Sequence, residues 1–315
     1  MPHARRRFLT RAAGCAVSAA LSGPLAFGQQ RKGRTRLILL GTRGGPRVDL
    51  EGSKNASTLL LIGGTPYVVD CGYGTTRQLL AAGVPLRDLR YVFLTHHHSD
   101  HNLEYGPLVY NAWIAGLADP LHAYGPPGMK KMSDAFFQSM EIDIETRIVD
   151  EGRPDPRKSV FAHDIDKAGV VLQNDDVKVT AAQVKHPAIE HAYAFRFDAR
   201  DRSVVISGDT AYAPSLVELA KGADVLVHEV LYLPGVESLL KRVPNASRLR
   251  EHLLASHTQP EDVGKLAARA GVKTLVLSHF VPGDDPSITD DQWAEGVRKH
   301  FSGRIVVGKD LMEVE

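Results

Sequence analysis

The chain of 315 residues has little cysteine, few aromatic residues and no excess of either charge. It contains two Cys, which excludes a disulfide-rich scaffold. Its 38 basic and 37 acidic residues exclude the strongly cationic composition of many nucleic-acid-binding proteins. The run at 12–26 is too short and too polar for a membrane span. With 43% hydrophobic residues, the composition predicts a globular protein of one or two domains.

The first 28 residues have the pattern of an export signal. Three arginines at 5–7 precede the weakly apolar run, and no acidic residue occurs before Asp49. This resembles a twin-arginine signal cleaved before Gln29, which predicts a periplasmic or secreted protein without a stable membrane anchor. A basic N-terminus that stays attached is the alternative. The predicted mature chain keeps 34 basic and 37 acidic residues, a net charge of −3, and only Cys71.

Short apolar strands alternate with helical patterns after this leader. Strands are expected at 37–40, 58–62, 67–70, 91–95, 121–124, 177–184, 192–197, 204–207, 225–227 and 274–277, and helices at 75–82, 103–117, 215–221 and 260–270. Residues 151–167 contain two prolines and many charges, so they are expected to form an irregular surface excursion. Two strand-rich halves without a flexible linker predict a layered α/β arrangement in one domain at 34–315.

A histidine-rich segment follows the expected strand at 91–95. His96 and His98 point to the same side in extended backbone. Where the chain turns into a helix, Asp100 and His101 can reach a second point close by. Imidazole and carboxylate are good zinc ligands, so this spacing suits two adjacent cations. A solvated polar loop that binds metal adventitiously is the alternative for this segment taken alone.

Three further candidate ligands follow other apolar strands. They are His186, Asp209 within Gly-Asp-Thr, and His279. Loops at strand ends commonly carry the chemistry of layered α/β folds. For Asp209, an ordinary turn is the alternative interpretation.

These residues together resemble the metallo-β-lactamase superfamily. The segments 39–42, 69–72 and 124–128 look like the framework of that family, and the match extends over nearly the whole mature chain. Val227-His228-Glu229 and the segment 256–261 are similar to two extra motifs of the ribonuclease Z, arylsulfatase and cyclic-nucleotide phosphodiesterase branch. The resemblance implies a four-layer αββα sandwich with the metal site at one edge of the two sheets.

The resemblance also implies a dinuclear ligand set. His96, His98 and His186 would bind the first metal, Asp100, His101 and His279 the second, and Asp209 would bridge both. A carboxylate suits this bridging role because its two oxygens can serve cations about 3.5–4 Å apart. Two Zn²⁺ are the expected cofactors, with Mn²⁺ or Fe²⁺ as alternatives for such N/O ligands.

The implied mechanism is hydrolysis. Two zinc ions can hold a bridging water and lower its pKa toward about 7, which supplies hydroxide at neutral pH. Besides Asp100, the expected catalytic residues are His257, which handles the phosphate or leaving-group oxygen, and Glu229, which orients that imidazole. A place at the start of a helix is a second, compatible interpretation of His257.

The expected function is that of an exported dinuclear-zinc hydrolase that cleaves phosphodiester or sulfate esters of small to medium size. A metallo-hydrolase of a lactone, carboxylic ester or β-lactam is the alternative. A non-catalytic metal-binding protein is disfavoured, because storage does not require Glu229 and His257. The acidic mature charge and the absence of a Gly/Pro-rich arm predict a small-molecule substrate and no nucleic-acid partner. A homodimer is compatible with the resemblance.

Selectivity is expected to depend on residues outside the ligand set. The candidates are Tyr73, Trp113, and the segments 151–167 and 232–254. His252 fits no motif and is expected on the surface or in the core.

Overall fold

The computed structural model describes residues 33–48 and 52–315, and Gly33–Glu315 form one compact unit. The predicted export signal at 1–28 lies outside the described residues and stays a prediction. None of the helices that the structure describes has the length and apolar character needed to cross a membrane.

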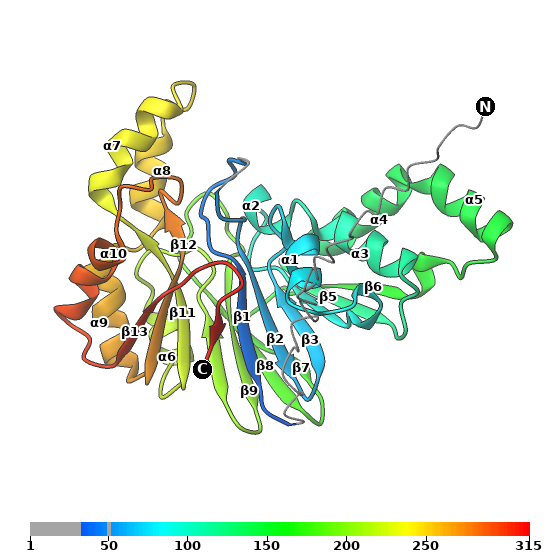
Figure 1. Cartoon of the computed structure of the whole chain (residues 1–315), viewed down its shortest axis with the longest axis horizontal. Coiled ribbons are helices and arrows are strands. Elements are labelled where there is room, and N and C mark those ends of the chain that lie inside the picture. Colours follow the sequence, from blue (N-terminus) through cyan, green and yellow to red (C-terminus); the bar gives the residue numbers. More distant parts are fainter. Residues whose placement is uncertain (1–32, 49–51) are drawn as a thin grey trace, which may run out of the picture. The chain divides into compact units, whose positions relative to one another are not determined.

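Two seven-stranded sheets form the centre of this unit (Figure 1). The first contains β1 (Arg36–Gly41), β2 (Ser57–Ile62), β3 (Thr65–Val69), β4 (Tyr91–Phe93), β5 (Leu121–Gly125), β6 (Val160–Asp164) and β14 (Glu313–Val314), in the order β14-β1-β2-β3-β4-β5-β6. The second contains β7 (Gly169–Gln173), β8 (Val177–Gln183), β9 (Tyr193–Ala199), β10 (Ser203–Ile206), β11 (Val225–Leu231), β12 (Thr274–Val281) and β13 (Arg304–Val307), in the order β13-β12-β11-β10-β9-β8-β7.

Each sheet combines an antiparallel part with a parallel part. β2 and β3 form a hairpin in which Ile62 pairs with Thr65 across Gly63 and Gly64, both with positive φ. Glycine adopts such angles without steric cost, which explains the tight turn. β3 to β6 are parallel, and so are β10 to β13. The carboxyl ends of the parallel strands within each sheet therefore share one edge.

Helices flank both sheets. They are α1 (Thr75–Ala81), α2 (Ser99–Asn102), α3 (Tyr105–Ile114), α4 (Met129–Ser139), α5 (Glu141–Glu151), α6 (Pro214–Leu219), α7 (Leu233–Arg242), α8 (Leu249–Ser256), α9 (Pro260–Ala270) and α10 (Asp290–Arg298), with 3₁₀ turns at Leu86–Asp88 and Pro156–Lys158. Side chains of α1, α3 and α4 pack on the first sheet, and those of α6, α9 and α10 pack on the second. α7 and α8 stand together beyond the end of the second sheet (Figure 1).

A third apolar cluster lies between the sheets. In β1, Leu37 and Leu39 join this inner cluster, whereas Ile38 and Leu40 face the helices. This alternation is the period of a strand with both faces buried. Phe93 of β4 packs edge-on against Phe197 of β9, with ring centroids 5.3 Å apart. The four-layer αββα prediction is therefore confirmed.

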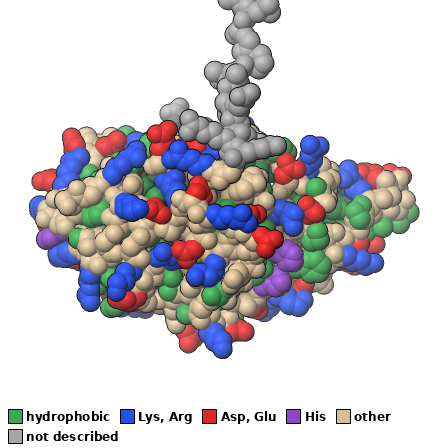
Figure 2. All heavy atoms as spheres, turned by 90° about the horizontal axis from the view of Figure 1, so that it is seen from below, with side chains coloured by type: hydrophobic (Ala, Val, Ile, Leu, Met, Phe, Trp, Pro, Cys, Tyr) green, Lys and Arg blue, Asp and Glu red, His purple; other side chains and the backbone are tan. Residues whose placement is uncertain are grey.

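The expectation for 151–167 was wrong. This segment contains β6, which extends the first sheet, because Val160 is buried against the helices and Ala162 packs beside it. The prolines precede the strand, where no ladder hydrogen bond is lost. Helices α4, α5, α7, α8 and α10 were also missed. On the face seen in Figure 2, cationic and anionic side chains are intermixed, as the balanced composition suggests.

Candidate metal centre

All seven predicted ligands come together at one edge of the two sheets. His96 and His98 follow β4, Asp100 and His101 belong to α2, His186 follows β8, Asp209 follows β10, and His279 lies in β12. All are buried except His98, which is half-buried. Their metal-binding role itself stays a prediction.

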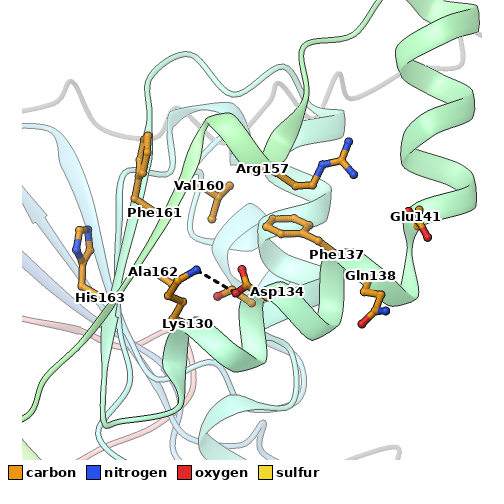
Figure 3. Close-up of a pocket in the computed structure, with 11 residues that line it drawn as sticks. Lys130, Asp134, Phe137, Gln138, Glu141, Arg157, Val160, Phe161, Ala162 and His163 are labelled. Atoms are coloured by element: carbon orange, nitrogen blue, oxygen red, sulfur yellow. Dashed lines mark hydrogen bonds and ion pairs between the residues drawn. The ribbon is translucent and has the colours of Figure 1, made fainter.

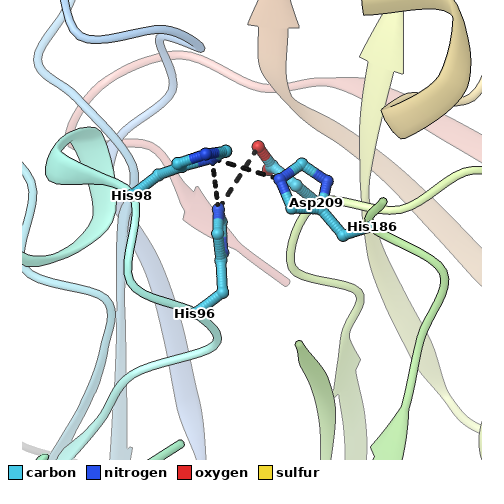
Figure 4. Close-up of side chains that lie close together, drawn as sticks. All are labelled: His96, His98, His186 and Asp209. Carbon is cyan, nitrogen blue, oxygen red and sulfur yellow. Dashed lines mark hydrogen bonds and ion pairs between the residues drawn. The ribbon is translucent and has the colours of Figure 1, made fainter. Parts of the chain in front are cut away.

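The first cluster consists of three imidazoles and one carboxylate (Figure 4). Nδ1 of His98 lies 3.1 Å from Nε2 of His96 and 3.1 Å from Nε2 of His186. Oδ2 of Asp209 is 3.9 Å from Nε2 of His96. One donor atom from each residue lies within 4.8 Å of the others, so four donors face one point.

The second cluster adjoins the first and shares Asp209 with it. Nε2 of His101 and Nε2 of His279 are 3.1 Å apart. Oδ2 of Asp100 lies 3.3 Å from Nε2 of His279, and Oδ1 of Asp209 lies 3.2 Å from the same nitrogen. Asp209 thus directs one oxygen toward each cluster, which is the arrangement expected of a bridging carboxylate.

The charges and donors of these clusters fit divalent cations. Burial lowers the pKa of His96 well below its ordinary value and that of His186 to about 4, so both rings are neutral and carry lone pairs. Burial opposes the negative charge of Asp209, yet nearby His279 and His101 hold its pKa well below the usual range. Among the described residues, Oδ1 of Asp209 finds no hydrogen-bond donor. Converging lone pairs and an orphaned carboxylate oxygen suit cations of the zinc type.

Neighbouring groups fix the direction of the ligand rings. Oδ2 of Asp70 lies 2.8 Å from Nδ1 of His101, and its Oδ1 accepts a hydrogen bond from the Thr95 amide at 2.8 Å. The carbonyl oxygen of Ser256 lies 3.3 Å from Nδ1 of His186. Such partners leave Nε2 of each ring for a metal and raise the basicity of the ligand. Sequence reasoning gave Asp70 no role, although an acidic residue directly after a buried strand was an available signal.

The backbone before Asp209 requires glycine. Gly208 has φ +58°, and a Cβ atom there would lie 2.9 Å from Cβ of Thr95 and 2.9 Å from the Tyr193 carbonyl oxygen. A larger residue would therefore push apart the loops that carry ligands of both sheets. His279 also has positive φ, 45°, a conformation that costs about 1–3 kcal/mol in a non-glycine residue and is typical of functional sites.

Glu229 and His257 form a buried pair beside the second cluster. Oε2 of Glu229 lies 3.2 Å from Nδ1 of His257, while Oε1 accepts a hydrogen bond from the Thr258 amide at 2.6 Å. Burial lowers the pKa of His257, but Glu229 and then Asp209 outweigh it and raise the value to about 9. The carboxylate of Glu229 thus favours the protonated form of His257, and the role of His257 as a proton donor stays a prediction.

A cavity of about 320 Å³ opens onto both clusters and His257. Of the expected selectivity residues, the segment 232–254 contributes to its wall, but Trp113 is buried in the core on the first sheet. The placement of His252 on the surface or in the core was wrong, because its ring lines the cavity 5.5 Å from that of His98. No sequence motif marks His252, which reaches the site only through the packing of α8.

A second cavity, of about 510 Å³, lies beside α4 and β6 (Figure 3). Lys130, Phe137 and Phe161 are among the side chains around it. It contains none of the predicted ligands or catalytic residues.

Known relatives correct one expectation. Ribonuclease Z of Mycobacterium marinum is 35% identical over 282 residues, which cover 89% of this chain and 98% of that protein. Ribonuclease Z of Mycobacterium bovis is 34% identical, with 89% and 97% covered. The exclusion of nucleic acid was therefore wrong. A net charge of −3 is a sum over the whole surface and says little about the cleft, whose lining includes Arg43 and Arg47.

Solved structures and a family model agree on the fold. The metallo-beta-lactamase fold protein YhfI from Bacillus subtilis superposes with a TM-score of 0.64 at 21% identity, covering 89% of this chain and 98% of that one. Human tRNase Z, short form, gives 0.64 at 18% identity, covering 89% and 98%. The model of the beta-lactamase superfamily domain matches residues 65–280. The chain belongs to the metallo-β-lactamase superfamily.

Proposed function

We propose that this protein is a dinuclear-metal phosphodiesterase that cleaves RNA, as a ribonuclease Z-type enzyme. The observation that carries the proposal is the meeting of three groups in one place: two His/Asp clusters that share Asp209, and the Glu229–His257 pair. A metal-storage site would need no buried proton donor beside the ligands. The identity of 35% to a ribonuclease Z over nearly its whole length supports RNA as the substrate.

The two metals are proposed to be zinc. His96, His98 and His186 would hold one, Asp100, His101 and His279 the other, and Asp209 both. When bound, the cations polarise the phosphoryl group and make water nucleophilic at neutral pH.

The protein's own groups perform the remaining tasks. His257 is protonated at neutral pH, and Glu229 accepts a hydrogen bond from its Nδ1. The proton at Nε2 is therefore the one passed to the leaving oxygen. The buried carboxylate also stabilises the imidazolium before transfer and fixes the ring. Asp70 holds the ring of His101 in place. At the rim, Arg47 supplies positive charge for a phosphate backbone.

The test uses the full chain with its zinc content quantified. Its substrates are an RNA with a structured 5′ part and a fluorescent single-stranded 3′ tail, and bis(p-nitrophenyl) phosphate. Cleavage of both is expected, with loss on chelation and recovery on adding Zn²⁺. A protein that contains two equivalents of metal and cleaves neither substrate would contradict the proposal. Cleavage of the small diester alone would contradict the RNA assignment.

A further inference from the structure

The cavity over the metal centre has two chemically different walls. One consists of the His/Asp clusters together with Arg43 and Arg47. The other consists of apolar side chains of α7, α8 and their connection: Leu239, Val243, Ala246, Leu249 and Leu253. Both walls enclose the same space of about 320 Å³, so one ligand would contact both.

The apolar wall is supported from behind. Leu231, Val236, Leu253 and Val281 form a small buried core, against which Leu239 and Leu249 pack. Leu249 is nevertheless only half-buried, as is Val243. Both residues also line the cavity, so they present apolar surface to it.

His252 stands at the border between the two walls. Its ring centroid lies 5.5 Å from that of His98, 5.7 Å from that of His186 and 6.0 Å from that of His257. Its Nδ1 lies 3.4 Å from Oγ of Ser256 on the same helix. A planar ring with one nitrogen engaged by its own helix thus closes the apolar pocket on the side of the metal centre.

We propose that this pocket recognises the nucleobase next to the scissile phosphodiester, an inference that rests on the proposed function. Enzymes hold single bases between apolar or aromatic side chains and read their edges by hydrogen bonds. Leu249 and Val243 supply such a face, and His252 supplies the ring at the edge.

The charge of the rim favours a nucleotide over an alkyl ester. Arg47 and Arg242 share a single carboxylate, Asp284, at 2.9 and 2.8 Å. Arg43 lies 3.8 Å from the same carboxylate, and Asp285 interacts with Arg242, so three guanidinium groups face two carboxylates and leave positive charge beside the apolar pocket. A phosphate attached to a planar base matches that combination.

Equilibrium binding tests the pocket independently of turnover. Isothermal titration of the zinc-loaded full chain compares AMP, ribose 5-phosphate and hexyl phosphate. AMP is expected to bind at least about tenfold more tightly than ribose 5-phosphate, because packing a base on side chains is worth that much. AMP should also bind more tightly than hexyl phosphate. Equal affinities for AMP and ribose 5-phosphate, or hexyl phosphate binding as tightly as AMP, would overturn the inference.

Substitutions locate the effect. Leu249→Ser and Val243→Ser should each lower the ratio of AMP to ribose 5-phosphate affinity toward one. The matched control is Val149→Ser on α5, where the side chain is 85% exposed and distant in the fold; it should keep the wild-type ratio. Zinc content and circular dichroism report folding. Wild-type ratios in both pocket variants would overturn the inference.

The two proposals fail in different ways. Hydrolysis of bis(p-nitrophenyl) phosphate by the same zinc-loaded wild type is measured in parallel. If it is absent, the proposed function is contradicted. If it is present while AMP shows no advantage, only the base pocket is contradicted.

Discussion

The two ends of strands β10, β11 and β12 carry polar clusters of opposite character. At the amino ends, Asp224 accepts hydrogen bonds from the amide and hydroxyl of Ser203, both at 2.8 Å, and pairs with Lys273 at 2.7 Å. The carboxylate of Asp224 there thus has both a cation and hydrogen-bond donors as partners. At the carboxyl ends, Asp209 and His279 leave Oδ1 and Nδ1 without hydrogen bonds among the described residues.

The difference shows where the fold gives up stability. Buried polar groups that lack partners cost about 1–3 kcal/mol each, whereas an exposed ion pair contributes about 1 kcal/mol or less. The carboxyl ends therefore hold a carboxylate oxygen of Asp209 that a cation would satisfy, whereas the carboxylate of Asp224 at the amino ends already has its partners. Substitutions at the two ends should have correspondingly different consequences.

The largest effect is expected for Asp209→Asn. The amide keeps the shape but removes the negative charge shared by both clusters. Substitution of a residue that hydrogen-bonds to a metal ligand typically lowers metal affinity by up to about 100-fold. Asp209→Asn should lower it further and abolish hydrolysis. Metal analysis after dialysis and rates on bis(p-nitrophenyl) phosphate provide the measurement. Two equivalents of metal retained at wild-type affinity would contradict the bridging role.

His257→Ala should affect turnover without affecting metal content. Loss of a positioned general acid costs about 10²- to 10⁴-fold. The loss should be greatest for substrates with poor leaving groups, since p-nitrophenolate needs no proton. The measurement is kcat on an RNA substrate and on bis(p-nitrophenyl) phosphate. Equal losses on both substrates would argue against the role of proton donor, and loss of metal would indicate a structural role instead.

Asp70→Asn should have an intermediate effect. It weakens the contact that holds the ring of His101, and such changes reduce metal affinity about 10- to 100-fold. A chelator competition measures this affinity. At saturating Zn²⁺ the activity should return toward that of the wild type, which distinguishes the substitution from Asp209→Asn. Unchanged affinity would show that Asp70 does not orient the ligand.

Asp224→Asn should have the smallest effect and leave metal binding intact. Burial opposes ionisation, but Lys273 and Ser203 lower the pKa of Asp224 from 3.8 to about 2. The folded state thus stabilises the carboxylate, a contribution of about 0.2–1 kcal/mol for an exposed pair. It is complete above about pH 4 and disappears as the pH falls toward 2. Urea unfolding of the wild type and the variant is measured at pH 7 and at pH 3. The difference between their free energies of unfolding should be smaller at pH 3. A difference that stays the same at both pH values would contradict the contribution of the Asp224 carboxylate.

Most of the candidate ligands were accessible from the sequence because they follow or end an apolar strand, and the resemblance to the superfamily supplied the complete set, including Asp100 and His101 of α2. His96 and Asp209 illustrate this, since both come after short runs of buried residues. The strands themselves were recognised where β-branched residues are continuous, as at Val204, Val205 and Ile206 in β10. β6 escaped notice because its residues are only partly buried and two prolines precede it. Element boundaries in such stretches depend on pairing partners that local sequence does not reveal.

The sequence by itself determined the layered fold, because strand periodicity is a local property, and its family resemblance named the seven candidate ligands that the structure brings together. Only the tertiary structure decided that Asp70 stands behind His101, that α7 and α8 form one wall of the cleft, and that His252 lines it. Those relations depend on contacts between segments far apart in the chain. The balanced overall charge likewise gave no sign of the arginines that line the cleft, because a net charge does not tell where in the structure the charged residues lie.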